Sequence, residues 1–581
     1  MSTKSLEFEA ARNRLMERYD DLEAATASFV WPRLEEFNFA LDWFDFVASD
    51  PVRGAQDALW LIHHDETHVR RTFAQLAADS GRVANWLRQI GVRRGDRVLL
   101  MLGNQVELWE VQLAAMKLGA PIIPTSLLMP PADLTDRVER GRVSWVVTDA
   151  ERAPRFAEVP GDYRLIVVGD VPGGLGRDAH PYADSASAAE GFEPDGPTPS
   201  HDPLLLYFTS GTTAQAKLVE HSHYSYSFGH LTTMYWMGLQ PGDVHANIAS
   251  PGWGKHAWSN FFAPWLAEAC VFVYEQPRFD PVALLDHMQI ARVTSFCAPP
   301  TVWRMLIQAD LNRLADPPRS LISAGEPLNP EVMRRIEDAW GVVVRDGYGQ
   351  TETTLTIANT LGQPVVPGAM GRAMPGYKIE LFDVATGEVA DEGEICLWVA
   401  DTPPGIMEGY IDEPERTAEV IVDGWYHTRD IASRDAAGVF TYVGRSDDVF
   451  KASDYRISPF ELESALIEHP AVAEAAVVPA PDPVRTAVPK AYVVLAGGVE
   501  PTMALAGEIL AFAKSRLAPY KRIRRLEFTD VPKTISGKIR RVALREREEA
   551  RSVAGWAGSS ADDKAAGGLD VEYREADFKK K

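Results

Sequence analysis

The sequence is poor in cysteine and carries no excess of positive charge. Only three cysteines occur in 581 residues, Cys270, Cys297 and Cys396, and each lies in an apolar, strand-like run. We expect buried thiols in a reducing compartment, and neither a disulfide nor a metal set. The formal net charge of −23 argues against nucleic acid or an anionic membrane surface as a partner.

Long hydrophobic runs are also missing. No uninterrupted apolar stretch approaches the length that crosses a bilayer, so no membrane span is expected. The first residues lack the charged-then-apolar pattern of a signal peptide and are too acidic for a transit peptide. These absences predict a cytoplasmic protein. The histidine-rich segment 63–68 lies between two strand-like runs, which predicts a polar hairpin turn and not a zinc site.

The familiar catalytic motifs are absent too. A P-loop needs Gly, four residues, Gly-Lys and then Ser or Thr. Lys217 is flanked by Ala216 and Leu218, and Lys538 is followed by Ile539, so neither lysine fits. No Ser-His-Asp or Cys-His constellation stands out. Ordinary P-loop chemistry and triad-type acyl transfer are therefore both unsupported.

Two other segments carry the chemistry. The run Tyr207-Phe208-Thr209-Ser210-Gly211-Thr212-Thr213 places hydroxyls and backbone N–H groups directly after an apolar strand, with Lys217 just beyond. The run 532–541, Pro-Lys-Thr-Ile-Ser-Gly-Lys-Ile-Arg-Arg, offers Lys538 on a glycine-turned loop. Backbone donors and a lysine are what a protein needs to hold polyphosphate and to stabilise charge during attack on it.

Taken together, the motifs resemble those of the adenylate-forming enzymes, which comprise acyl-CoA synthetases, non-ribosomal adenylation domains and luciferases. Four further segments agree in order, at 323–328, 346–352, 425–430 and 444–448, and the resemblance runs from roughly residue 50 to 548. It looks closest to medium-chain acyl-CoA synthetases. Six ordered motifs are far more specific than one.

The resemblance implies a nucleotide site with assigned roles. Lys538 would contact the carboxylate and the α-phosphate, Arg456 a phosphate and Glu352 magnesium. Tyr348 would stack on adenine, Asp430 would take the ribose hydroxyls, and Arg445 would lie on the ribose. The cofactor-binding set as a whole is Thr209, Ser210, Gly211, Thr212, Thr213, Lys217, Gly325, Glu326, Pro327, Asp346, Gly347, Tyr348, Gly349, Gln350, Thr351, Asp430, Tyr442 and Arg445.

The same resemblance implies an acyl pocket, a hinge and a CoA tunnel. Trp253, His256 and Gly349 would line the pocket. A glycine at 349 is expected to leave space for a longer or aromatic chain, because acetate-specific relatives carry a Trp there. Asp447 would be the hinge. Ser453, Asp454 and Tyr455 would meet CoA.

Two departures from the family pattern matter. The phosphate loop has Ala214 and Ala216 where relatives carry Gly and Pro, and an alanine held at positive φ would strain the loop by about 1 kcal/mol. Asp454 replaces the glycine that lines the pantetheine tunnel in relatives, and so places a side chain and a charge there.

For the fold, alternating helix and strand signals predict an α/β protein. We expect a large N-terminal domain (1–446) of two doubly wound α/β subdomains plus a small β-barrel, and a smaller C-terminal α+β lid domain (447–550). The polar tail 551–581 is expected to be disordered.

The favoured function is an AMP-forming acyl-CoA synthetase of fatty-acid metabolism that works by domain alternation. A medium-chain fatty or aromatic acid would react with ATP, with Mg²⁺ present, to acyl-AMP and pyrophosphate, and then with CoA. No general base is needed, since a carboxylate is already ionised at neutral pH. Three alternatives stay open: an acyl-AMP ligase that delivers to a carrier protein, a luciferase-like oxygenase, and a non-catalytic adenylate-binding protein. Homo-oligomerisation also stays open.

Overall fold

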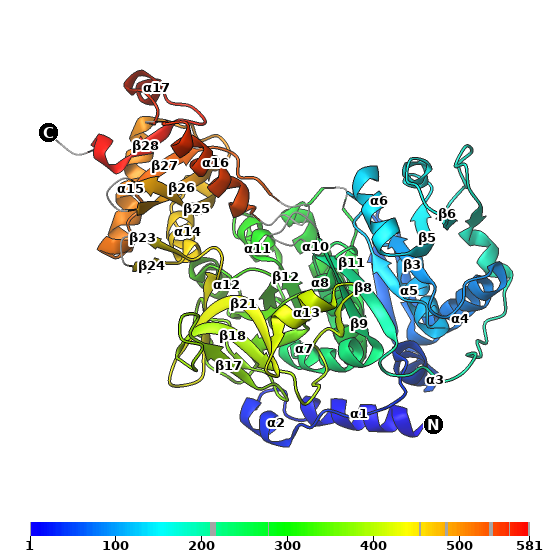
Figure 1. Cartoon of the computed structure of the whole chain (residues 1–581). Coiled ribbons are helices and arrows are strands. Elements are labelled where there is room, and N and C mark those ends of the chain that lie inside the picture. Colours follow the sequence, from blue (N-terminus) through cyan, green and yellow to red (C-terminus); the bar gives the residue numbers. More distant parts are fainter. Residues whose placement is uncertain are drawn as a thin grey trace. The chain divides into compact units, whose positions relative to one another are not determined.

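The computed structural model describes residues 2–209, 216–276, 278–452, 455–482, 486–533, 539–556 and 558–578 (Figure 1). Of residues 455, 456 and 486 it describes the backbone. The chain divides into two compact units. The first comprises Met1–Ile379, Leu397–Tyr426 and Ala436–Phe440, and the second Glu380–Cys396, His427–Asp435 and Thr441–Lys581. The expected boundary after residue 446 stays a prediction.

One sheet of the first unit has eight strands in the order β19-β9-β8-β4-β3-β5-β6-β7. Its centre is parallel, whereas β9 runs antiparallel to both β8 and β19. The strands are β3 (Arg97–Met101), β4 (Ile122–Pro124), β5 (Val143–Asp149), β6 (Arg164–Val168), β7 (Ala179–Pro181), β8 (Pro203–Thr209), β9 (Lys217–Ser222) and β19 (Gly409–Tyr410).

Helices α4 (Phe73–Ile90), α5 (Val106–Leu118), α6 (Pro131–Arg140) and α13 (Pro414–Val420) also belong to this unit. The sequence sets the ends of α4. Thr72 accepts a hydrogen bond from the Gln75 N–H, and the Gln75 side chain accepts one from the Thr72 N–H. This reciprocal cap satisfies N–H groups that the helix leaves unpaired. Gly91, at φ +109°, ends the helix in a conformation that glycine adopts without strain.

A second sheet has nine strands in the order β16-β15-β14-β13-β12-β10-β11-β1-β2. From β14 through β1 all neighbours are parallel. The strands are β1 (Asp57–Ile62), β2 (His68–Thr72), β10 (Val244–Asn247), β11 (Cys270–Tyr274), β12 (Ser295–Ala298), β13 (Ser320–Ala324), β14 (Val344–Gly349), β15 (Leu355–Ala358) and β16 (Arg372–Ala373). The antiparallel β1–β2 hairpin confirms the turn predicted at residues 63–68.

Apolar side chains of this sheet pack against α10, α11 and α12 in one continuous core. The remaining helices of the unit are α1 (Thr3–Met16), α2 (Leu22–Ser28), α3 (Asp45–Ser49), α7 (Gly229–Met237), α8 (Gly254–Ala257), α9 (Ala263–Leu266), α10 (Pro281–Ala291), α11 (Pro300–Leu306) and α12 (Pro330–Trp340). Two largely parallel sheets with intervening helices confirm the α/β fold class.

Where the sequence predicts a small β-barrel, the structure has a five-stranded sheet in the order β17-β18-β21-β20, with β22 paired to β21. They are β17 (Ile379–Phe382), β18 (Glu392–Trp398), β20 (Ile421–Val422), β21 (Trp425–Arg434) and β22 (Phe440–Arg445). Neighbouring strands of a sheet bring residues distant in sequence together, and β21 is the longest member.

The rest of the second unit is an α+β fold. A hairpin of β23 (Phe450–Ala452) and β24 (Tyr455–Ile457) precedes the four-stranded sheet β25-β26-β27-β28. Ser458 caps α14 by accepting from the Glu461 N–H, and Pro459 is the first helical residue. The elements are β25 (Val472–Asp482), β26 (Thr486–Leu495), β27 (Arg525–Phe528), β28 (Glu572–Arg574), α14 (Pro459–Ile467), α15 (Met503–Arg516), α16 (Arg541–Val553) and α17 (Ala561–Ala566).

The prediction of a disordered tail after residue 550 is wrong for the described residues. β28 pairs antiparallel with β27, and Tyr573 is fully buried in the core of this unit. The mean composition of the tail hid a few well-spaced apolar residues, Val571, Tyr573 and Phe578, which pack on that core. A strand needs only alternate residues to face inward, so a polar average does not exclude one.

Candidate active site

The end of β8 leads into the expected phosphate loop. Thr209, the last residue of β8, pairs with Lys217, the first residue of β9. The loop between them follows the carboxyl end of a strand that lies parallel to β4, which is where ligands bind in such sheets. Ser210, Gly211, Thr212 and Thr213 lie outside the described residues.

Lys217 belongs to a chain of polar contacts. Its Nζ donates to the Tyr410 hydroxyl at 2.9 Å, and that hydroxyl donates to Oε1 of Glu352 at 2.9 Å. Lys217 Nζ also lies 3.9 Å from the same oxygen. The structure therefore brings two predicted residues together, the loop lysine and the candidate metal ligand. Tyr410 was missed, because only the pairing of β19 with β9 places it here and no local spacing signals it.

The turn after β13 offers an exposed edge. Gly325 adopts φ +105°, and Gly325 and Glu326 are exposed while Pro327 is half-buried. Asp346 stabilises this turn, because one of its oxygens accepts from the Leu328 N–H at 3.2 Å. Its other oxygen accepts from the Gly347 N–H at 3.0 Å. Burial raises the pKa of Asp346 to about 7. Asp346, which was predicted to belong to the nucleotide site, thus accepts hydrogen bonds from the backbone in the structure.

The segment after β14 is fixed by buried partners. The Tyr426 hydroxyl donates to Oε1 of Gln350 at 2.7 Å. His221 Nε2 lies 2.7 Å from the Thr351 carbonyl, and burial lowers the pKa of His221 to about 4. The ring is therefore neutral at pH 7, with its proton on Nε2 because a carbonyl can only accept. Gln350, Thr351 and Glu352 thus follow one another along a backbone that neighbouring elements hold in place.

The three residues predicted to line the acyl pocket differ in their burial and contacts. His256 is buried, with Nε2 3.1 Å from Oδ1 of Asn104, and burial lowers the pKa of His256 to about 3. Trp253 is half-buried and precedes α8. The expectation of open space beside Gly349 is wrong. A Cβ there would lie 2.3 Å from the Thr354 carbonyl oxygen and 2.6 Å from Cη2 of Trp258. The indole of Trp258 therefore fills that space.

Orphaned polar atoms mark the carboxyl ends of two nearby strands. Asn247, the last residue of β10, has both side-chain amide atoms buried without a hydrogen-bond partner among the described residues, and Oγ of Ser323 on β13 is in the same state. The strand β12 pairs with both β10 and β13. Buried polar groups are normally hydrogen-bonded, so a polar ligand group is expected to satisfy them. Sequence reasoning did not select Asn247.

In the second unit, β21 and β22 bring three predicted nucleotide residues together. The Tyr442 hydroxyl donates to Oδ1 of buried Asp430 at 3.2 Å, and Nη1 of Arg445 lies 3.9 Å from that oxygen. Burial and the charge of Asp430 hold the pKa of Tyr442 well above its usual value. Arg445 Nε also donates to Asp447, the predicted hinge, at 3.4 Å.

Other predicted residues fall outside the description. Ser453, Asp454 and Lys538 lie outside the described residues, and Tyr455 and Arg456 are described by backbone alone, in β24. Sequence reasoning also missed Asp448. Its carboxylate binds Arg541, at 3.5 Å from Nη1, and Arg545.

Within the described ranges, no helix is both long and apolar enough to cross a membrane. The family model for AMP-binding enzymes matches residues 50–411, and that for the AMP-binding enzyme C-terminal domain matches residues 461–538. The chain is 40% identical over 534 residues to 4-hydroxybutyrate–CoA ligase 1 of Metallosphaera sedula, with 91% of this chain and 93% of the relative covered.

It is also 36% identical over 558 residues to the mitochondrial acyl-coenzyme A synthetase ACSM3 of Rattus norvegicus, with 92% and 95% covered. Among solved structures, it is similar to the anthranilate CoA ligase AuaEII in complex with anthranoyl-AMP. The TM-score is 0.79 at 26% identity, and 90% of this chain and 99% of that chain are covered.

Proposed function

This chain belongs to the AMP-binding enzyme family and is an acyl-CoA ligase, and we propose that its substrate is a medium-chain fatty or aromatic acid. The observation that carries the site assignment is the Lys217–Tyr410–Glu352 chain of contacts at the phosphate loop. A lysine and a carboxylate held beside a polyphosphate loop serve to bind anionic phosphate and the cation that accompanies it.

The first half-reaction joins the acid to AMP. A carboxylate oxygen attacks the α-phosphorus of ATP, the bond to the bridging oxygen breaks, and pyrophosphate leaves with its electron pair. Lys538 and Arg456 are the cations assigned to the approaching anions, and Lys217 the cation assigned to the phosphate loop. Asp430, Tyr442 and Arg445 are assigned to the ribose. Fixed charges of this kind stabilise a transition state without reorganising.

The second half-reaction transfers the acyl group. The CoA thiolate attacks the acyl carbonyl, the carbon–oxygen bond to phosphate breaks, and AMP leaves. We assign Asp447 as the pivot that withdraws Lys538 and presents residues 453–456, in a lid motion of the kind that often limits turnover.

Magnesium fits the residues that are present. Mg²⁺ is usually held by one or two carboxylates plus substrate phosphates, and Glu352 offers a carboxylate that is 14% exposed and oriented by Tyr410. Mg²⁺ would neutralise phosphate charge when bound there. The residue that holds it is assigned as Glu352.

Trp258, and not Gly349, is proposed to set the length of the acid. Its ring occupies the space next to Gly349, and its Nε1 donates to the Tyr226 hydroxyl at 3.0 Å, which fixes the indole as a wall. A buried methylene contributes about 0.8 kcal/mol, so a wall of this kind favours acids that end before it.

The test is pyrophosphate release from ATP and Mg²⁺ across acids from acetate to dodecanoate and aromatic acids, with and without CoA. Turnover only with CoA, and highest from butyrate to decanoate or with an aromatic acid, supports the proposal and shows that Asp454 is tolerated. Release of about one equivalent despite CoA would favour a carrier-protein acceptor. No release with any acid would favour a non-catalytic adenylate-binding protein.

The proposal also covers the cellular location and the oligomeric state of the protein. We assign the protein to the cytoplasm and to fatty-acid metabolism, although some relatives are mitochondrial by name. Fractionation of cells decides the first point, and light scattering of the purified chain tests for a homo-oligomer.

A further inference from the structure

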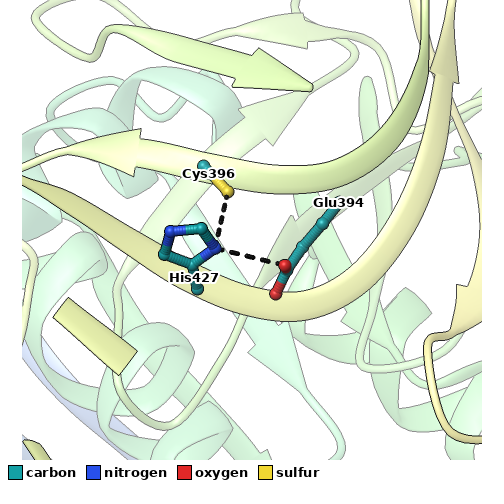
Figure 2. Close-up of side chains that lie close together, drawn as sticks. All are labelled: Glu394, Cys396 and His427. Carbon is teal, nitrogen blue, oxygen red and sulfur yellow. Dashed lines mark hydrogen bonds and ion pairs between the residues drawn. The ribbon is translucent and has the colours of Figure 1, made fainter. Parts of the chain in front are cut away.

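Three side chains with metal-binding atoms, none of them assigned a role above, converge on the five-stranded sheet. Glu394 and Cys396 lie two residues apart on β18, and successive even positions of a strand share one face. His427 comes from β21, the neighbouring strand. Figure 2 shows the three side chains pointing toward one another. Their ligand atoms all lie within 4.8 Å of one another.

The two hydrogen-bond contacts within this cluster converge on one ring nitrogen. Nδ1 of His427 lies 3.3 Å from Sγ of Cys396 and 3.1 Å from Oε2 of Glu394. That nitrogen has one position in the ring plane, and it is either a donor or an acceptor. It can therefore not accept from the thiol and donate to the carboxylate at the same time. A cation between the three atoms would satisfy all of them at once.

We propose that Glu394, Cys396 and His427 form a binding site for a divalent ion of the zinc class. Zinc bonds of about 2.3 Å to sulfur and about 2.0–2.2 Å to nitrogen and oxygen, at tetrahedral angles, place S and N about 3.5 Å and N and O about 3.3 Å apart. The observed separations of 3.3 and 3.1 Å are each within a few tenths of an ångström.

The surroundings support an ion that enters from solvent. Cys396 is buried, whereas the side chains of Glu394 and His427 are 17% and 28% exposed. Three protein ligands leave a fourth position for water. The backbone N–H of Arg429 donates to the other carboxylate oxygen of Glu394, Oε1, at 2.6 Å. This bond orients Oε2 toward the site, as partners behind metal ligands commonly do.

The ligand types select the ion. Thiolate and imidazole suit zinc and its neighbours in the first transition row, whereas magnesium and calcium prefer oxygen. The site therefore differs in chemistry from Glu352, and Mg²⁺ at the working concentration of the enzyme should not displace the ion.

A bound ion would cross-link β18 and β21 close to Asp430. Between His427 and Asp430, the Thr428 hydroxyl donates to the Ile395 carbonyl at 2.8 Å and accepts from the Asp430 N–H at 3.1 Å. The site and the ribose aspartate thus share one short stretch of β21. The role assigned to the ion is structural: it would fix the two strands against each other.

The test uses the full-length protein, purified without a metal column and treated with a chelator. Zn²⁺ affinity is measured by competition with a chromophoric chelator in excess Mg²⁺, and Co²⁺ is added as a spectroscopic probe. We expect one equivalent of Zn²⁺ per chain and a thiolate-to-cobalt charge-transfer band. Cys396→Ser should abolish the band and weaken Zn²⁺ binding at least about 100-fold, since even residues behind the ligands change affinity by 10–100-fold.

The matched control is Cys270→Ser, because Cys270 is also a buried strand thiol but lies outside the cluster. It should keep the band and the affinity. His427→Gln provides a second variant should Cys396→Ser fail to fold, because the side chain of His427 is only half-buried. It should lose both the charge-transfer band and the Zn²⁺ affinity. No equivalent of Zn²⁺ in the presence of Mg²⁺, or a band that survives in both ligand variants, overturns the proposal.

Discussion

Two lysines, one in each unit, bind carboxylates in opposite ways. Lys490 is fully buried, and Glu527, Glu548 and Glu572 each place an oxygen 2.8 Å from its Nζ. Lys217 is 16% exposed, lies 3.9 Å from Oε1 of Glu352 and also contacts that carboxylate through the Tyr410 hydroxyl. The first lysine has as many carboxylates as an ammonium group has protons. The second is partly exposed and lies farther from its carboxylate.

The difference teaches which charges are structural. Around Lys490 the excess carboxylates are matched by further cations, since Arg547 and Arg551 bind Glu527 and Arg574 binds Glu572. Burial of charge is tolerated only when the partners are complete. Lys217, by contrast, is partly exposed and begins β9 directly after the segment assigned to phosphate.

The largest expected effect comes from breaking the buried set. Lys490→Met leaves three buried carboxylates without their common cation, so we expect a loss of about 3–5 kcal/mol in the free energy of unfolding. Denaturant unfolding of the full chain measures it, and hydrogen exchange in β26 and β27 localises it. Lys514→Met, at an exposed position on α15, is the control. Equal stability of the two variants would refute the structural role of Lys490.

The Lys217 region should instead respond in rate. Glu352→Gln removes the charge at the assigned metal position, and we expect pyrophosphate release to fall at least about 100-fold, the range seen when one stabilising group is removed from a transition state. Tyr410→Phe keeps the carboxylate but loses the hydrogen bond that orients it, worth about 1 kcal/mol, so a loss of several-fold is expected.

A control variant separates a loss of catalytic rate from a loss of stability. Tyr235→Phe is the control for Tyr410→Phe, since the buried Tyr235 hydroxyl donates to the Arg18 carbonyl at 3.0 Å far along the chain. Its rate should stay unchanged. A rate for Glu352→Gln within threefold of the parent would show that the carboxylate does not serve the reaction.

A smaller effect is expected when the indole of Trp258 is removed, because this substitution changes no charge. Trp258→Ala should move the preferred acid to longer chains, since each further methylene gains about 0.8 kcal/mol when it is buried. The ratio of kcat/KM for octanoate over butyrate should rise at least about tenfold, and Trp258→Phe should fall between the two. An unchanged ratio in both variants would mean that the acid binds elsewhere.

The two units also differ in how their stability responds to pH, an effect of about 1 kcal/mol for each pH unit. Burial raises the folded pKa of Asp346 to about 7, so its contribution to stability is complete below about pH 4 and is lost as the pH rises to about 7. In Glu527, burial raises the pKa but the bonds from Arg551 and the charge of Lys490 lower it on balance, and Glu572 is lowered likewise against burial. The contribution of these two groups is present above about pH 4 and is lost in acid.

Asp346→Asn should therefore flatten the decline in stability between pH 5 and 7, by on the order of 1 kcal/mol per pH unit, and leave the acid limb in place. Thermal unfolding across that range gives the slopes. A slope that is the same in the parent and the variant would assign the titration to another group.

Much of the site could be predicted from short motifs. Thr209 and Lys217 frame one loop, and Asp430, Tyr442 and Arg445 lie on two adjacent strands, so their grouping follows from local order along the chain. Tyr410, Asn247 and Asp448 could not be predicted, because each acquires its position through a strand pairing or an ion pair with a residue far away in sequence. Gly349 shows the limit most clearly: its own identity said nothing about Trp258, which fills the space beside it.

The sequence by itself determined the α/β class, the order of the motifs along the chain, and the residue types that we assign to ATP and an acid. These are local properties, because helix caps, strand alternation and loop motifs depend on neighbours within a few residues. Only the tertiary structure decided that a polar tail supplies β28, that Trp258 bounds the space beside Gly349, and that Cys396 meets His427 and Glu394. Such contacts depend on how sheets align their strands, and the packing of distant residues against one another sets that alignment.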